Sequence, residues 1–105
     1  VSRNYNKGIM SRLVNDVINK GYVYFDWNVD SNDAGGDGSN SNKIYNNVIN
    51  GLSHSKTNIV LMHDSASHVS TVNALRDIIK YGKDNGYSFK AITNDTPVVR
   101  HGVNN

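Results

Sequence analysis

The chain has 105 residues, a formal net charge of +2 and no cysteine. This length suffices for one small domain but not for a complete eight-stranded β/α barrel, which needs about 250 residues. No basic cluster stands out, so a nucleic-acid partner is not expected. The absence of cysteine excludes disulfides and thiolate metal ligands. No apolar stretch approaches the roughly 20 residues that span a bilayer, so no membrane span is expected.

Apolar residues recur at helical spacing in three segments, and each of these segments is predicted to be a helix. The first helix is expected over 7–20, followed by Gly21, which can adopt the left-handed conformation that ends a helix. The second helix is expected from Ser41 to Leu52, with Ser41 as its capping residue. The third is expected to begin near Val69 and to end near Gly86.

Three strands are expected between and after these helices, over 22–29, 58–62 and 87–92. The segment 31–41 is crowded with Asn, Asp, Gly and Ser and is expected to be a loop. Helices alternating with strands predict an α/β fold whose parallel strands are joined by right-handed crossovers. Because Ile59 to Met62 is apolar throughout, we expect its strand to lie inside a larger parallel sheet. The segment 94–105 contains Pro97 and is expected to be an irregular tail.

Two of the expected strands end on side chains that can carry out acid/base chemistry. Asp30 ends the first strand, and His63 directly follows the second. Parallel strands present their carboxyl ends at one edge of a sheet, about 4.8 Å apart, so Asp30 and His63 are expected within hydrogen-bonding reach. A carboxylate that orients an imidazole is a general acid/base device. The alternative is that both residues only satisfy loop backbone groups.

The other polar residues carry weaker signals. Asp33 could simply shape its loop through side-chain to backbone hydrogen bonds. His54, His68 and His101 show no metal-ligand spacing and are expected at the surface. The Gly-rich stretch 35–38 lacks the Lys-Ser/Thr that follows a phosphate-binding loop. No paired cysteines and no H-E-x-x-H pattern are present.

The two strand ends together resemble two motifs of the polysaccharide deacetylases, carbohydrate esterase family 4. The fourth motif of that family resembles WNVDSND at 27–33, and the fifth resembles IVLMHD at 59–64. The segment 71–86 and the Gly-Tyr after it are similar to the family's final helix and strand. The resemblance covers the chain from Lys20 to about Ile92. Within the family, it is greatest to the peptidoglycan N-acetylglucosamine deacetylases of Gram-positive bacteria.

The resemblance implies an N-deacetylation reaction and a role for each matched residue. His63 would be the general acid that protonates the leaving amine, and Asp30 the carboxylate that holds it. Leu61, Asp33 and Trp27 would lie on the substrate side, with Leu61 in the pocket for the acetyl methyl group. The family uses a divalent ion, usually zinc, to polarise the carbonyl group and activate water. No metal is expected on this chain alone.

The chain departs from the family pattern in two respects. Ala34 follows Asp33 where the family usually has Trp, so that wall of the sugar pocket is missing or supplied elsewhere. The first three motifs, which carry the catalytic base and the metal ligands, are absent. We therefore interpret 1–105 as a single partial domain, the carboxyl-terminal portion of a deacetylase domain and the last units of a distorted β/α barrel.

The sequence thus favours a parent enzyme that deacetylates cell-wall glycan outside the cell or at its surface, with this chain inactive by itself. The alternative is a non-catalytic α/β module for binding or assembly. A small α/β hydrolase is disfavoured because the chain has no Gly-x-Ser-x-Gly turn. An incomplete barrel leaves strand edges open, and open edges pair with other chains, so a homo-oligomer is also expected.

Overall fold

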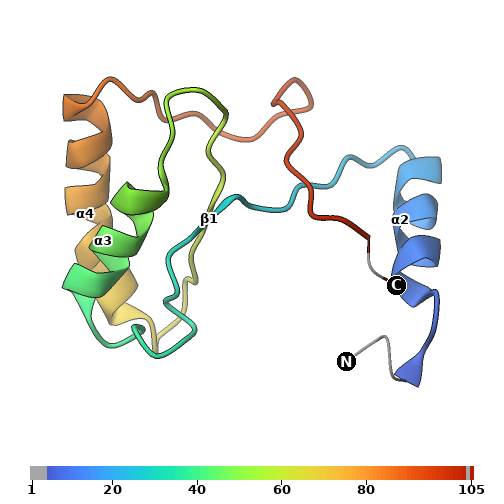
Figure 1. Cartoon of the computed structure of the whole chain (residues 1–105), viewed down its shortest axis with the longest axis horizontal. Coiled ribbons are helices and arrows are strands. Elements are labelled where there is room, and N and C mark those ends of the chain that lie inside the picture. The colour runs from blue at the N-terminus through green and yellow to red at the C-terminus, as the bar shows by residue number, and fades with distance from the viewer. Residues whose placement is uncertain (1–4, 104) are drawn as a thin grey trace.

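The computed structural model describes residues 5–103 and 105, which form an α/β arrangement around a parallel pair of short strands (Figure 1). The elements, in chain order, are α2 (Ile9–Asn19), β1 (Val29–Asp30), α3 (Ser41–Gly51), β2 (Val60–Leu61) and α4 (Val69–Asp84). The three helices agree with the predicted ones to within two residues at each end, because their apolar positions repeat at helical spacing.

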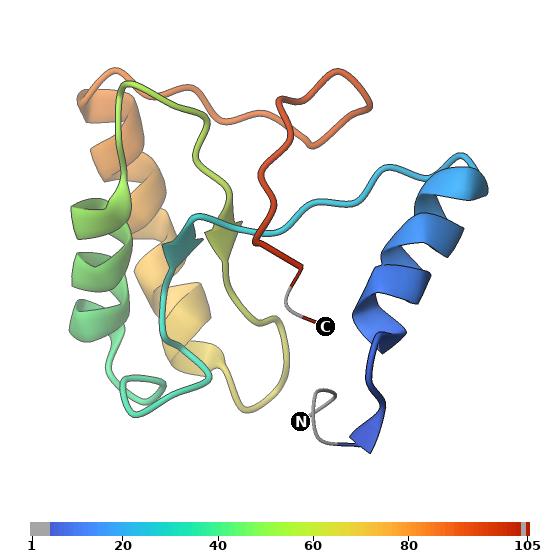
Figure 2. The ribbon, with the colours of Figure 1, turned by 45° about the vertical axis from the view of Figure 1, so that its right-hand side comes forward.

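The strand pair and the two helices after it hold the hydrophobic core. β1 pairs with β2 in register Val29 to Val60 and Asp30 to Leu61. α3 and α4 lie side by side against one side of this pair, and α2 stands on its other side (Figures 1 and 2). The buried hydrophobic residues are Val29, Ile44, Val48, Ala74 and Ile78. Fully burying a Val or Ile side chain contributes about 1.5–3 kcal/mol, so this cluster is the main anchor of the fold.

The start of α3 is capped by Asn40 and not, as expected, by Ser41. Asn40 has an extended backbone, and its side chain accepts a hydrogen bond from the Lys43 backbone N–H at 3.1 Å. The Ser41 hydroxyl instead donates to the Ser70 carbonyl at 3.0 Å. Ser41 therefore ties the first turn of α3 to the first turn of α4, and the loops before both helices are held together.

The strands are shorter than predicted. Of the expected strand over 22–29, only Val29 belongs to β1, and the Asp26 backbone N–H instead donates to the Val99 carbonyl at 2.8 Å. The expected strand over 87–92 does not form, and Phe89 and Ile92 are about half exposed. A strand needs a neighbour to complete its hydrogen bonds, and the described residues supply none for 87–92. The described part of 94–105 contains neither helix nor strand.

α2 has the predicted apolar positions but buries none of its residues. Leu13 and Ile18 remain 47% and 45% exposed. Its amino-terminal end is fixed instead by polar contacts, in which Gly8 and Ser11 donate to Asn105 at 2.8 and 2.7 Å. α2 is thus attached to the rest of the described chain mainly through hydrogen bonds.

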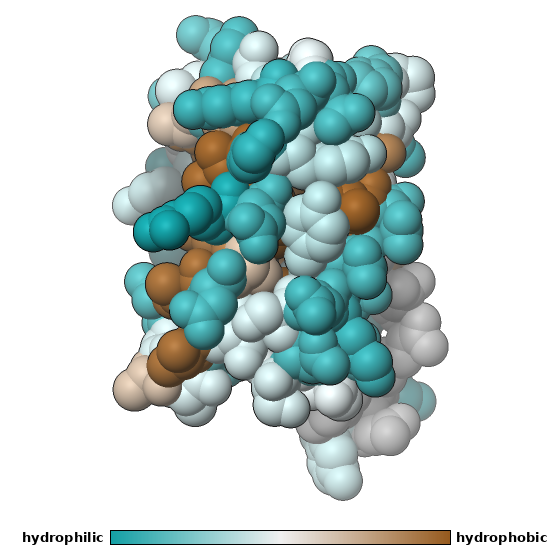
Figure 3. All heavy atoms as spheres, turned by 90° about the vertical axis from the view of Figure 1, so that its left-hand side faces the viewer, coloured by the Kyte–Doolittle hydropathy of each residue, from teal (hydrophilic) through white to brown (hydrophobic). Residues whose placement is uncertain are grey.

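The outer face of α3 and α4 is largely hydrophilic, with a few hydrophobic spots (Figure 3). The exposed hydrophobic residues of α4 are Val69, Val72 and Leu75. Among the described residues, each helix is either too short or too polar to cross a lipid bilayer.

Candidate active site at the strand ends

The carboxyl ends of β1 and β2 bring together two segments that are thirty residues apart in the chain. Beyond β1, the backbone N–H of Ser31 still donates to the Leu61 carbonyl at 3.3 Å, so the two chains remain adjacent past the strands. Burial alternates along this stretch: Val29, Ser31 and Asp33 are buried, whereas Asp30 and Asn32 are exposed. β1 ends at Asp30, and the chain turns at Asn32, which has a φ of 56°, before the buried Asp33 side chain.

Asp33 and His63 form the central contact of the site. One Asp33 oxygen, Oδ1, lies 2.7 Å from His63 Nδ1. The other oxygen, Oδ2, accepts the His63 backbone N–H at 2.7 Å and the Thr71 hydroxyl at 2.7 Å. The Asp33 side chain is 1% exposed, whereas that of His63 is 43% exposed. A buried carboxylate therefore holds an imidazole that is open to solvent.

The hydrogen bonds on Asp33 determine its charge. Burial by itself would raise the pKa of Asp33, but the hydrogen bonds from the His63 side chain, the His63 backbone, Thr71 and Ser31 outweigh burial and lower the pKa to about 2. Asp33 is thus ionised at neutral pH. Its negative charge stabilises the positive charge that His63 carries when it is protonated. When Nδ1–H donates to the carboxylate, Nε2 is the nitrogen left to exchange a proton with a ligand.

The prediction that Asp30 contacts His63 is wrong, because Asp33 makes that contact. Asp30 Oδ1 accepts the backbone N–H of Asn32 at 2.8 Å, and Asn32 has a φ of 56°. Asp30 therefore shapes the turn that leads to Asp33. The physical reason is the turn at Asn32, which leaves Asp30 exposed and places the Asp33 side chain in the buried position.

The loop after Asp33 is held in place by close backbone packing and by Asp37. A Cβ atom on Gly38 would lie 2.3 Å from the Asp33 carbonyl oxygen, so only glycine fits there without a shift. Asp37 accepts hydrogen bonds from Asn32 at 3.1 Å and from Asn47 at 3.0 Å, and these contacts lower its pKa. Asn47, which lies on α3, also donates to the Ser31 carbonyl at 3.0 Å. The loop is thereby anchored to α3.

His68 lies beside the pair, although the sequence indicated only a surface position for it. Its ring stacks on that of His63 with 5.1 Å between centroids and 23° between planes. The Ser65 hydroxyl lies 2.6 Å from His68 Nδ1. Asp33, His63 and His68 each offer one possible ligand atom, and these atoms lie within 4.8 Å of one another. The other two histidines are elsewhere: His54 stacks on Tyr87, and His101 contacts Trp27.

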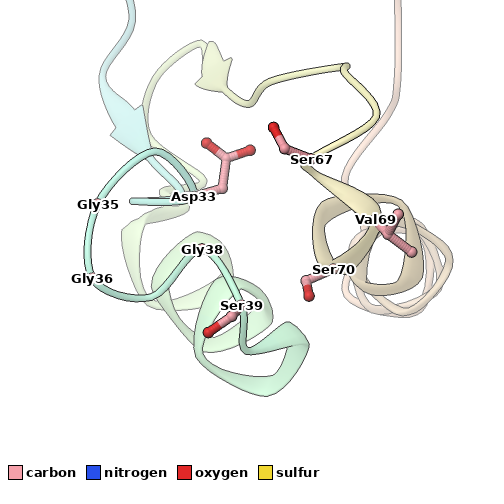
Figure 4. A pocket seen from close by; sticks show the side chains of 8 residues that line it. All are labelled: Asp33, Gly35, Gly36, Gly38, Ser39, Ser67, Val69 and Ser70. Atoms are coloured by element: carbon pink, nitrogen blue, oxygen red, sulfur yellow. The ribbon is translucent and has the colours of Figure 1, made fainter.

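A pocket of about 390 Å³ opens next to Asp33. Asp33 and the glycine-rich loop face Ser67, Val69 and Ser70 across it (Figure 4). The full lining is Asp33, Gly35, Gly36, Gly38, Ser39, Ser67, Val69 and Ser70. The pocket therefore presents mostly hydroxyl and backbone groups, and one of its lining residues is the carboxylate that holds His63.

The expected substrate-side residues are not gathered in this pocket. Leu61 is half-buried in β2, directly before Met62 and His63. Trp27 precedes β1 and packs against His101, with 4.5 Å between ring centroids and its carbonyl 2.7 Å from His101 Nε2. Asp33 does line the pocket, but both of its oxygens are engaged by protein donors.

Sequence reasoning missed Thr71 and the proximity of His68. Thr71 belongs to the buried stripe of α4, together with Ala74, Ile78 and Gly82. A hydroxyl on such a stripe needs a buried partner, and this signal could have pointed to a polar group at the strand ends. His68 lies five residues after His63 and directly before α4. This spacing is a weaker signal of proximity, because turns of that length vary in shape.

The fold and the site define an α/β domain with a carboxylate-held histidine at the ends of parallel strands. No family model matches the chain. The chain is 37% identical over 84 residues to "Putative polysaccharide deacetylase YheN" of Bacillus subtilis (strain 168), a match that covers 77% of this chain and 28% of that protein.

A solved structure of a deacetylase is also similar to this chain. The crystal structure of the catalytic domain of peptidoglycan N-acetylglucosamine deacetylase from Eubacterium rectale ATCC 33656 matches with a TM-score of 0.88 and 42% identity. The match covers 99% of this chain and 46% of that structure, so the chain spans less than half of either relative. The resemblance to the carboxyl-terminal part of a polysaccharide deacetylase domain is confirmed.

Proposed function

We propose that this chain is the acid-bearing part of an enzyme that removes N-acetyl groups from a cell-wall glycan such as peptidoglycan. The observation that carries the proposal is the Asp33 to His63 pair, 2.7 Å apart, in a segment similar to two deacetylases. In this proposal His63 is the general acid, and Asp33 takes the positioning role that the sequence had given to Asp30.

The chemistry of amide hydrolysis explains the need for such a pair. Water attacks the acetyl carbonyl carbon, and the C–N bond then breaks as the nitrogen leaves. The nitrogen is a poor leaving group until it is protonated, so a proton donor must stand beside it. His63 Nε2 delivers this proton, while Asp33 fixes the ring through Nδ1 and stabilises the imidazolium. The 43% exposure of the His63 side chain leaves it accessible to a polymer.

The metal of the reaction does not fit the donors described here. The resemblance to the family implies a divalent ion that activates water. Asp33, His63 and His68 are a suitable donor set by type, but a His63 that coordinates a metal has no proton to give. We therefore derive no step through a metal on these residues, and propose that the parent enzyme binds its ion, zinc by preference, elsewhere. The isolated chain is then inactive.

We further propose a fold, substrate contacts and a location for the parent enzyme. The described elements would be the last units of a distorted β/α barrel. Leu61 is the candidate for contact with the acetyl methyl group because it lies two residues before His63. Trp27 is the weaker candidate because its ring is occupied by His101. A cell-wall substrate implies an enzyme that is extracellular or at the cell surface.

The test is His63→Ala in the parent enzyme that carries this segment, with acetate release from N-acetylglucosamine oligomers as the measurement. Loss of a general acid is expected to lower kcat by about 10²- to 10⁴-fold. The matched control is His54→Ala, which removes a histidine that stacks on Tyr87 away from the pair. Turnover that survives in His63→Ala at the control level would reject the acid role and favour a non-catalytic binding module.

A further inference from the structure

We propose that Asp33, His63 and His68 form a binding site for one divalent transition-metal ion, separate from any metal that takes part in the reaction. The observation is the group of ligand atoms, one from each residue, that lie within 4.8 Å of one another. Of the described residues, these are the only three His, Cys, Asp or Glu side chains gathered in this way. Binding itself does not depend on the proposed function.

The surroundings of the three side chains favour coordination. Asp33 is ionised, and its Oδ2 is fixed by Thr71 and by the His63 backbone, so the carboxylate is already oriented. Such partners behind a ligand hold its position and increase metal affinity. Asp33 Oδ1 faces the imidazoles, 2.7 Å from His63 Nδ1. Metal ligation would replace this hydrogen bond, with release of a proton if His63 is protonated at that nitrogen.

His68 is oriented in a comparable way. Its Nδ1 lies 2.6 Å from the Ser65 hydroxyl. When Nδ1–H donates to that hydroxyl, the lone pair of Nε2 is free to bind a metal. The two rings are stacked, with 5.1 Å between centroids and 23° between planes, so both imidazoles lie side by side. An ion placed there would meet two imidazoles and one carboxylate.

This donor set selects the class of metal. Imidazole nitrogen suits Zn²⁺, Co²⁺, Ni²⁺ and Cu²⁺, whereas Mg²⁺ and Ca²⁺ prefer oxygen ligands. Tetrahedral Zn²⁺, with bonds of about 2.0–2.2 Å, holds its ligand atoms about 3.3 Å apart. The ligand atoms here lie within 4.8 Å of one another, so any pair wider than about 3.3 Å must close on binding. His68 can supply this movement because it is only partly buried and precedes the first turn of α4.

Occupation of the site would inhibit catalysis, and this effect rests on the proposed function. A metal ion and a catalytic proton would compete for the same imidazole, His63. An ion at this site would therefore inhibit a deacetylase in which His63 is the acid.

The experiment is a titration of the metal-free 105-residue chain with Co²⁺ and then Zn²⁺. The visible spectrum of Co²⁺ reports tetrahedral nitrogen and oxygen coordination, and a chromophoric chelator gives the affinity for Zn²⁺. The variants are His68→Gln and Asp33→Asn, with His54→Gln as the matched histidine control. We expect one equivalent bound by the native chain and by His54→Gln, and affinity at least tenfold lower in His68→Gln and in Asp33→Asn.

Thermal unfolding supplies a second readout. Zn²⁺ should raise the Tm of the native chain and of His54→Gln, and should leave that of His68→Gln unchanged. His68 has no buried packing role, so His68→Gln remains informative even if Asp33→Asn does not fold. Equal affinity in His68→Gln and His54→Gln, or no stoichiometric binding by the native chain, would overturn the proposal.

Discussion

Asp33 connects three segments of the chain that are far apart in sequence. It lies in the loop after β1 and accepts hydrogen bonds from His63, after β2, and from Thr71, in α4. Removing a partner from such a buried carboxylate costs more than the hydrogen bond itself contributes, because the charge is left without solvation. The site and the fold therefore depend on the same residue.

The lowered pKa of Asp33 predicts a pH dependence of stability. The folded-state pKa of about 2 lies below the ordinary value of 3.8, so the stabilisation is fully present above pH 3.8 and is lost as the pH falls through about 2. The expected loss is about 2 kcal/mol of unfolding free energy. Urea unfolding at several pH values, with a chelator present, measures it.

The control for this prediction is Asp33→Asn, which cannot titrate. Its unfolding free energy should be lower at neutral pH and should depend less on pH over the same window. A native chain whose stability follows that of Asp33→Asn at every pH would contradict the assignment.

At the scale of elements, the loop between β1 and α3 positions Asp33, the carboxylate that holds the candidate acid His63. Its carboxyl-terminal end is fixed by the Asn40 cap, and its middle by Asp37 and Asn47. Short backbone contacts inside the loop leave little freedom at Gly38. The loop therefore acts as a rigid support for Asp33.

Gly38→Ala tests this rigidity. The new Cβ would lie 2.3 Å from the Asp33 carbonyl oxygen, so the backbone around Asp33 must move. We expect a loss of about 1–3 kcal/mol in unfolding free energy, as for other substitutions that overfill a packed site. Gly36→Ala is the matched control, because a Cβ there meets nothing within 4 Å. Equal stability of the two variants would show that the loop adapts without cost.

The helices could be predicted from the sequence, whereas the strands and the pairing at the site could be predicted only in part. Helical spacing is a local property, so the boundaries of α3 and α4 followed from apolar positions. A strand depends on its neighbour, and 87–92 has none among the described residues. The choice between Asp30 and Asp33 depended on the positive φ at Asn32. The Asn, Asp, Gly and Ser content of the segment predicted a loop there but not the geometry of its turn.

At the scale of the whole molecule, the chain is less compact than its length allows. The radius of gyration is 15.9 Å, whereas a compact domain of about 100 residues has a value near 13 Å. Large hydrophobic side chains remain exposed on α2 and beyond α4, among them Leu13, Phe89 and Ile92. These exposed hydrophobic side chains and the open edges of the short sheet are surfaces that another protein chain can cover.

We therefore expect the isolated chain to self-associate. Open strand edges and exposed apolar side chains favour pairing between copies. Light scattering coupled to size-exclusion chromatography should show a mass above that of one chain, increasing with protein concentration. A single-chain mass at every concentration would contradict this expectation.

The hydrophobic core is confined to the middle of the chain, so we expect local unfolding to begin outside it. Among residues 5–103 and 105, the buried hydrophobic side chains all lie from Val29 to Ile78, whereas α2 buries none. Segments with few buried contacts open more readily than the core, so backbone amides of α2 should exchange with deuterium well before those of α3 and α4. Proteases should likewise cut first near α2. Exchange at equal rates in α2 and α3 would show instead that the polar contacts of Asn105 are enough to make the chain one cooperative unit.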